Sequence, residues 1–153
     1  LNQFPIKLLV SGEFYDKPEP YFQKIKDLKI EDKVRVEERF IPDNEVKNYF
    51  CSTDLIVLPY KTATQSGVTQ IGYHFSKPML VTNVGGLGEI IINGVSGYVT
   101  EPNSKSIADS ILDFCQIKKD FSVGIEEEKK KYSWGRMVDS INELIIKIDD
   151  NKK

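Results

Sequence analysis

The feature that most limits the possible folds is a buried strand that leads through a polar loop into a helix. Residues 55–58 form a continuous apolar run that Pro59 ends, as is typical of a strand covered on both faces. Residues 64–67 form a loop of small hydroxyl and amide side chains. The helix that follows shows the spacing of one apolar helix face, at Val68, Ile71, Gly72 and Phe75.

The start of this helix is a candidate anion site. Ser66 is its predicted N-cap, and free backbone N–H groups meet the positive end of the helix dipole there. We therefore expect the N–H groups of Ser66, Gly67 and Val68 to bind phosphate. Lys61, beside the loop, is a candidate for neutralising phosphate charge. The alternatives are an ordinary strand–helix connection and a solvated lysine.

Strands and helices alternate along the rest of the chain. Further strands are predicted at 6–10, 34–36, 79–82 and 97–100, and a helix at 19–29. This alternation predicts an α/β fold with a doubly wound, Rossmann-like parallel sheet. Ligands of such sheets bind at the carboxyl ends of the strands. Three small-residue loops are expected at that edge: Ser11-Gly12, residues 64–67 and Gly85-Gly86.

The last third of the chain is predicted to be helical. Ser104 and Ser133 are the expected N-caps of two helices, and the charge run 126–131 is expected to form a solvated helix surface. Trp134 is the expected packing anchor of the last helix. Its predicted buried positions are Met137, Ile141, Leu144, Ile145 and Ile148.

Length and composition indicate a soluble globular protein. The 153 residues fit one domain over 1–149 with a disordered tail at 150–153, and the net charge of −2 argues against nucleic acid as the main partner. Cys51, Cys115 and the single histidine, His74, are too scattered to form a metal site. With no signal peptide or membrane-spanning run, we expect a cytoplasmic protein, with the inner face of the membrane as the alternative location.

Five segments resemble, in order, the C-terminal donor-binding domain of a GT-B glycosyltransferase, family 4-like (glycosyl transferases group 1). They are LLVSGE, VRVEERFIPDNEVKNYFCSTDLIVLPY, FSKPMLVTNVGGLGEII, NGVSGYVTEPNSKSIADSI and YSWGRMVDSI. The resemblance implies transfer of a sugar from a nucleotide-diphosphate sugar, expected to be UDP-linked, to a glycan or a lipid-linked acceptor. It also implies retention of the anomeric configuration, no metal and no cofactor other than the donor substrate.

The resemblance also assigns expected roles to single residues. Ile41 matches a position that holds the nucleotide base through backbone groups, with loop packing as the alternative. Gly12 can let a diphosphate approach, or can simply make a tight turn. Gly85 and Gly86 fit a close backbone approach to the sugar, or a strained turn. No residue is assigned a catalytic role.

The departures from the family pattern are equally informative. Ala63 and Ile71 occupy the two positions where the family carries glutamates, and Ser66 stands in place of a loop glycine. Gln65 and Gln70 are the side chains here that can hydrogen bond to sugar hydroxyls. These changes keep a catalytically degenerate nucleotide-sugar binding or scaffolding module open as an alternative, and also a GT-B-like nucleotide-sugar epimerase.

Parts of the family's enzyme have no counterpart in these 153 residues. The resemblance implies that the C-terminal half of the GT-B fold lacks its first strand–helix unit here and that the N-terminal acceptor domain is missing. We therefore expect a fragment that is inactive alone. Its expected partners are a nucleotide-sugar donor, the acceptor domain and an acceptor that is associated with a membrane.

Overall fold

The computed structural model describes residues 4–150, which divide into two compact units between Tyr49 and Phe50. The tail predicted at 150–153 falls almost entirely outside the described residues. Each unit is built around parallel strands, which confirms the predicted α/β class.

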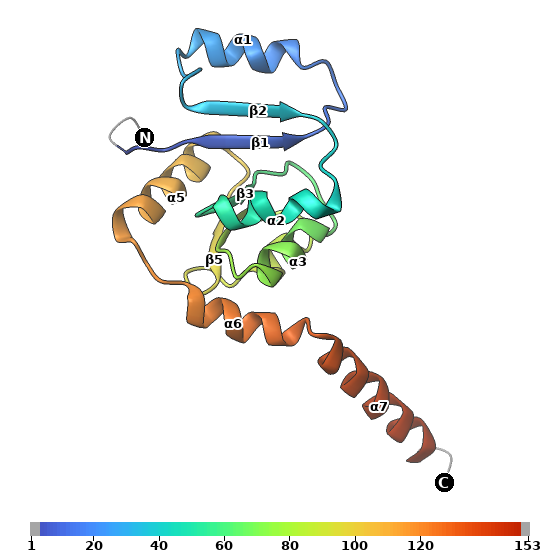
Figure 1. The fold of residues 1–153 in the computed structure, drawn as a ribbon. Helices are drawn as coiled ribbons and strands as arrows, with labels where there is room; N and C mark the ends of the chain where they lie inside the picture. Colours follow the sequence, from blue (N-terminus) through green and yellow to red (C-terminus); the bar gives the residue numbers. More distant parts are fainter. Residues whose placement is uncertain (1–3, 151–153) are drawn as a thin grey trace. The chain divides into compact units, whose positions relative to one another are not determined.

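The first unit contains a parallel pair of strands linked by a helix. β1 (Leu8–Gly12) and β2 (Val34–Glu38) run in parallel, with Leu8 opposite Val34 and Gly12 opposite Glu38. The connecting helix α1 (Glu19–Asp27) lies over the pair in Figure 1. β1 is displaced by two residues from the strand predicted at 6–10. Helix α2 (Asp43–Ser52) begins in this unit and crosses the boundary.

The second unit contains a three-stranded parallel sheet in the order β3 (Ile56–Leu58), β4 (Met79–Thr82) and β5 (Gly97–Thr100). All four residues of β4 are buried, as expected for the middle strand of a sheet covered on both faces. Helix α3 (Gly67–His74) follows β3, and the short helix α4 (Leu87–Ile90) follows β4. The chain ends in α5 (Ser104–Ile117), α6 (Ser122–Lys131) and α7 (Trp134–Asp150).

The hydrophobic core of the described chain lies in the second unit. Its buried side chains come from β3, β4, the helices α3, α4 and α6 and the segments that follow α4 and precede α6. They are Leu58, Tyr73, Met79, Val81, Leu87, Ile90, Ile91, Phe121 and Ile125. This core holds the carboxyl ends of β3 and β4 together.

Tyr73 joins α3 to this core through a buried hydroxyl. Its side chain is 1% exposed, its hydroxyl donates to the carbonyl oxygen of Ile90 at 2.6 Å, and Ser96 Oγ lies 3.2 Å from it. Burial raises the pKa of Tyr73 to about 12. The phenol therefore stays protonated and ties α3 to the end of α4.

Two predictions about the helices after β5 need correction. Asn103, not Ser104, caps α5: its side-chain oxygen accepts a hydrogen bond from the backbone N–H of Ser106 at 2.9 Å, and Ser104 is already the first helical residue. The run 126–131 is not fully solvated, because Glu128 is 8% exposed and pairs with Lys131 at 2.7 Å. The predicted cap Ser133 is confirmed, since its Oγ accepts from the N–H of Arg136 at 3.2 Å.

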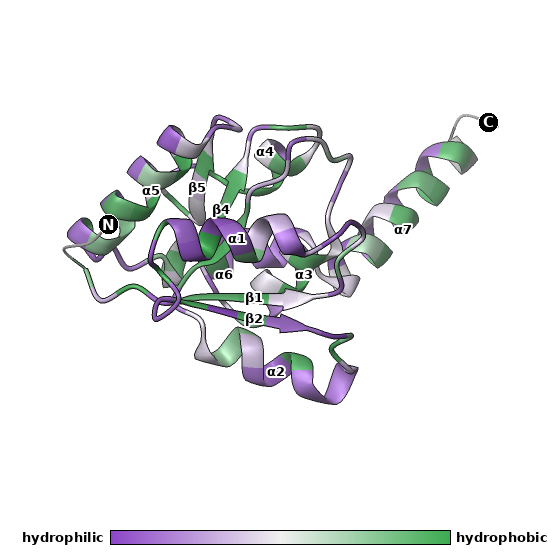
Figure 2. Cartoon of the chain, turned by 90° about the horizontal axis from the view of Figure 1, so that it is seen from above, coloured by the Kyte–Doolittle hydropathy of each residue, from purple (hydrophilic) through white to green (hydrophobic). Residues whose placement is uncertain are grey.

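The predicted burial of α7 is wrong. Its five expected core residues are 45–58% exposed and Trp134 is 81% exposed. Figure 2 shows hydrophobic residues along this helix, which extends away from the other elements of its unit. The apolar spacing was identified correctly, but no described element packs against that face. Within residues 4–150, no helix is long and apolar enough to cross a membrane.

Replacing Tyr73 with phenylalanine tests the buried hydroxyl. Tyr73→Phe leaves the Ile90 carbonyl without this donor, so we expect the free energy of unfolding to fall by about 1–3 kcal/mol. Urea unfolding of this variant measures the loss. Tyr15→Phe is the matched control, because Tyr15 is fully exposed. Equal stability of Tyr73→Phe and the wild type would contradict the assigned role.

Candidate functional site

Two of the three predicted small-residue loops meet in the second unit. They follow the carboxyl ends of the neighbouring strands β3 and β4. The backbone N–H of Gly86 donates to the carbonyl oxygen of Thr64 at 2.9 Å. Gly85 has a φ of +52°, and a Cβ atom there would lie 1.7 Å from the carbonyl oxygen of Ala63. Glycine is therefore required at position 85, both by the backbone conformation and by this close approach.

The N-terminus of α3 opens beside these loops. Ser66 is its N-cap, as predicted: its Oγ accepts from the N–H of Val68 at 3.3 Å. Thr69 Oγ1 donates to the Ser66 carbonyl oxygen at 2.6 Å. Among residues 4–150, no acceptor bonds to the N–H groups of Ser66 and Gly67. These two groups are therefore available to an anion, whereas the N–H of Val68 is already engaged by Ser66.

α3 packs against the sheet through a face that differs from the predicted one. Thr69, Gly72 and Tyr73 are buried, while Val68, Ile71 and Phe75 are only partly buried. A Cβ atom at position 72 would lie 2.5 Å from Met79 Sδ. Because glycine allows this close contact with β4, the buried stripe centres on Gly72, and the larger apolar side chains lie at its margins.

The polar candidates of the second unit lie on the surface. Lys61, Gln65 and Gln70 are exposed. Gln65 lies next to the glycine loop, since its Cγ is 3.7 Å from the point where a Cβ atom at Gly86 would stand. Ala63 and Ile71, at the positions where the resemblance implies glutamates, are partly buried and apolar. The amides are therefore accessible to a ligand, and neither position 63 nor position 71 carries a carboxylate.

The remaining predicted residues, Gly12 and Ile41, belong to the first unit. Gly12 ends β1 with a φ of +138°, and a Cβ atom there would have no neighbour within 4 Å. Ile41 lies in the loop between β2 and α2 and is partly buried. Gly12 is thus required by its backbone conformation. The ligand contacts of both residues stay predictions.

An ionic network lies at the end of β2, and no motif in the sequence predicts it. The Arg39 guanidinium donates to Glu45 and, at 2.9 Å, to the hydroxyl of Tyr49. Tyr49 in turn donates to Glu37. The hydrogen bond from Tyr49 lowers the pKa of Glu37, and the same bond raises the pKa of Tyr49. The network ties the first turns of α2 to the loop that carries Ile41.

A second contact that no motif predicts supports the N-terminus of α3. The Tyr60 hydroxyl lies 3.3 Å from Ser66 Oγ. The Tyr60 carbonyl oxygen accepts from Thr82 Oγ1 at 2.6 Å, and Thr82 is 0% exposed. Tyr60 follows the predicted strand and its Pro59 directly, but nothing in the sequence spacing relates it to Thr82. Only the parallel pairing of β3 with β4 brings the two together.

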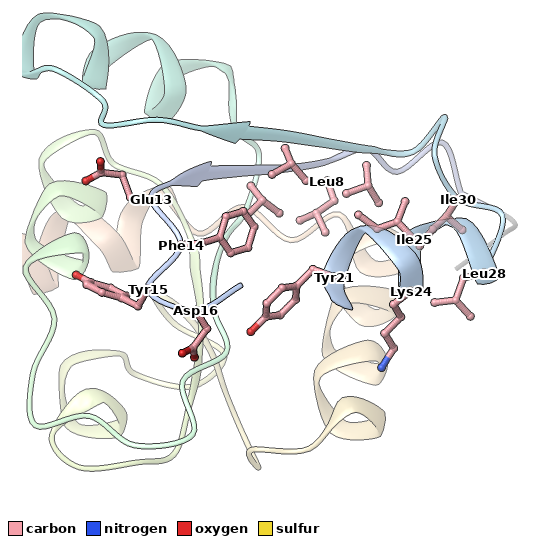
Figure 3. Close-up of a pocket in the computed structure, with 13 residues that line it drawn as sticks. Leu8, Glu13, Phe14, Tyr15, Asp16, Tyr21, Lys24, Ile25, Leu28 and Ile30 are labelled. Carbon is pink, nitrogen blue, oxygen red and sulfur yellow. The ribbon is translucent and has the colours of Figure 1, made fainter. Parts of the chain in front are cut away.

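The first unit also contains a pocket of about 510 Å³ between α1 and the strands. Figure 3 shows Phe14, Ile25 and Leu8 on its walls, with Asp16 and Lys24 at its margins. None of the predicted site residues lines it. Its apolar walls do not suit a diphosphate. Within residues 4–150, no cluster of three or more histidine, cysteine, aspartate or glutamate side chains could hold a metal ion.

Substituting two glycines tests the contact between the loops. Gly85→Ala places a Cβ atom against the Ala63 carbonyl at a positive φ. We therefore expect the free energy of unfolding to fall by about 1–3 kcal/mol from backbone strain alone. Gly67→Ala is the control, because a Cβ atom there meets nothing within 4 Å. We expect its stability to stay within about 0.5 kcal/mol of the wild type. Thermal melting that ranks the two variants equally would contradict the described geometry.

Comparison with known proteins identifies the family. The profile of the glycosyl transferases group 1 family matches residues 1–116. An uncharacterised glycosyltransferase of Methanocaldococcus jannaschii is 29% identical over 151 residues, which cover 96% of this chain and 42% of the relative. The chain therefore spans less than half the length of this curated relative.

Solved structures show the same fold at low sequence identity. The sucrose-phosphate synthase of Thermosynechococcus elongatus has a TM-score of 0.76 at 16% identity, over 97% of this chain and 40% of that one. Anabaena HepE in complex with UDP has a TM-score of 0.75 at 18% identity, over 95% of this chain and 42% of the HepE chain. The C-terminal domain of the group 1 glycosyl transferase LpcC of Francisella tularensis has a TM-score of 0.70 at 16% identity, over 87% and 90%.

These matches confirm the predicted fold, the C-terminal half of GT-B glycosyltransferases. The family profile covers more than half of the 153 residues. The chain thus belongs to the glycosyl transferases group 1 family.

Proposed function

We propose that this chain binds the donor of a retaining glycosyltransferase, a nucleotide-diphosphate sugar that is UDP-linked. The whole protein then transfers the sugar to a glycan or a lipid-linked acceptor. The second unit contributes the diphosphate site at the N-terminus of α3, next to the glycine loop Gly85–Gly86. Lys61 adds a positive charge near the phosphates.

The observation that carries this proposal is the meeting of two strand-end loops beside unused donors. The N–H groups of Ser66 and Gly67 have no acceptor among the described residues. They lie at the positive end of the α3 dipole, which favours an anion. Gly85 and Gly86, which have no side chains, bring their backbone against Ala63 and Thr64 in the loop before α3. Small residues at that edge leave room for a phosphate or a sugar to approach the backbone.

Family membership supports the choice of donor. Membership of the glycosyl transferases group 1 family indicates the reaction class. HepE, which shares this fold, has been crystallised with UDP. In the proposed reaction, the bond between the sugar and the diphosphate breaks and negative charge grows on the leaving group. Preorganised N–H donors and the helix dipole stabilise that charge more than they stabilise the intact donor. No metal ion is part of the proposal.

The acceptor side of the reaction belongs to the whole protein, since the chain covers 42% of the curated relative. We propose that an N-terminal acceptor domain completes the enzyme and that this chain alone does not transfer sugar. The proposed acceptor is a precursor of a polysaccharide. A lipid-linked acceptor would bring the protein from the cytoplasm to the inner face of a membrane.

One observation favours a second candidate, a catalytically degenerate module that binds a nucleotide sugar without transferring it. Ala63 and Ile71 place partly buried apolar groups where the resemblance implies carboxylates that contact the sugar and the ribose. Gln65 and Gln70 can hydrogen bond to hydroxyls, but as neutral groups they bind them more weakly than a carboxylate does. Binding with no measurable transfer by the whole protein would favour this candidate.

Calorimetric titration of the full protein tests donor binding. We expect UDP to bind more tightly than GDP or ADP, with the same affinity in magnesium and in EDTA. We expect Gln65→Ala and Gln70→Ala each to weaken the free energy of UDP binding by about 0.5–1.5 kcal/mol, the contribution of one neutral hydrogen bond. Gln116→Ala is the control, because Gln116 is exposed on α5, outside the proposed site.

Three outcomes would count against parts of this proposal. If none of the three nucleotides bound, donor binding would be contradicted altogether. A large gain in affinity with magnesium would contradict the metal-independent site. Wild-type affinity for UDP in both glutamine variants would show that backbone groups, rather than these amides, hold the ribose.

A further inference from the structure

Ser66 Oγ is the centre of a small hydrogen-bond chain that starts in the core. Thr82, fully buried at the end of β4, donates to the Tyr60 carbonyl oxygen at 2.6 Å. The ring of Tyr60 packs against the core, and its hydroxyl reaches Ser66 Oγ at 3.3 Å. Ser66 Oγ also accepts from the N–H of Val68 at 3.3 Å. The core thus fixes the surroundings of a hydroxyl at the N-terminus of α3.

The hydrogen-bonding capacity of a hydroxyl determines what Ser66 can do. A serine hydroxyl has two acceptor lone pairs and one hydrogen to donate. The Val68 N–H takes one lone pair. Either hydroxyl can donate in the contact between Tyr60 and Ser66, and the phenol, as the stronger acid of the two, is the better donor to the second lone pair of Ser66. With both lone pairs engaged, the hydrogen of Ser66 is left to donate to a further acceptor.

We propose that Tyr60 is a positioning residue, which orients the Ser66 hydroxyl so that its hydrogen is donated to a phosphate oxygen of the nucleotide. This inference rests on the proposed function and refines its diphosphate site. The hydroxyl adds a third donor to the backbone N–H groups of Ser66 and Gly67. Ser66 stands where the resemblance implies a glycine, so this side-chain donor is a property of this chain's own sequence.

A double-mutant cycle in the full protein tests the inference. UDP affinity is measured by calorimetry for the wild type, Tyr60→Phe, Ser66→Ala and the double variant. We expect Tyr60→Phe to weaken UDP binding about fivefold, the worth of one hydrogen bond. We expect it to have no effect in the Ser66→Ala background, because Tyr60 acts through Ser66. Such coupling is the signature of two residues in one chain of contacts.

Three controls separate positioning from general stability. Uridine, which has no phosphate, should bind all four proteins equally. Tyr98→Phe removes a hydroxyl from another partly buried tyrosine of the second unit and should leave UDP affinity unchanged. Ser66→Thr keeps the hydroxyl and the cap, so Tyr60→Phe should again weaken UDP binding in that background. The comparison of Ser66→Thr with the double variant Ser66→Thr/Tyr60→Phe keeps the test decisive even if Ser66→Ala unfolds the first turn of α3.

The outcomes distinguish the inference from the function on which it rests. Wild-type protein that does not bind UDP would overturn the proposed function, and the inference with it. Wild-type binding with unchanged affinity in Tyr60→Phe would overturn the inference alone. Equal losses from Tyr60→Phe in the wild-type and Ser66→Ala backgrounds would also overturn it, because Tyr60 would then act independently of Ser66.

Discussion

The candidate site depends on a single close contact between two backbone segments, the approach of the glycine loop to the loop before α3. The N–H of Gly86 bonds to the Thr64 carbonyl oxygen at 2.9 Å. Gly85 approaches the Ala63 carbonyl so closely that no side chain fits between them. This contact joins the ends of β3 and β4 into one surface and holds the start of α3 beside it. Without it, the two loops would be separate strand–helix connections.

Packing in the core of the second unit stabilises this contact. β4 is buried along its whole length, and Gly72 lets α3 pack closely on Met79. Tyr73 ties the same helix to the end of α4 through its buried hydroxyl. These contacts fix the axis of α3, and the direction of a helix axis determines where its free N–H groups point. Packing in the core therefore sets the geometry of the proposed anion site.

Much of the fold could be predicted because hydrophobic spacing reports local structure directly. The runs that became β3 and β4, the cap at Ser66 and the two strand-end loops were all identified from the sequence. The cap of α5 was placed one residue late, since Asn103 and Ser104 are both good caps and only the observed hydrogen bond separates them. The spacing of α7 predicted an apolar face correctly, but spacing does not say what covers that face.

The supporting contacts of the site were beyond prediction for a different reason. Tyr60 and Thr82 lie 22 residues apart, and the network of Arg39, Glu45 and Tyr49 joins a strand end to a helix. Such contacts depend on how elements pack, which no local pattern encodes. The loops were found because glycine and serine mark them, whereas ordinary tyrosines carry no such mark.

A crystal structure of the full protein with UDP tests the central claim most directly, that the N-terminus of α3 binds the diphosphate. The account predicts phosphate oxygens about 3 Å from the backbone nitrogens of Ser66 and Gly67, with the glycine loop at Gly85–Gly86 alongside. A diphosphate bound elsewhere, with those two N–H groups still facing solvent, would contradict the account.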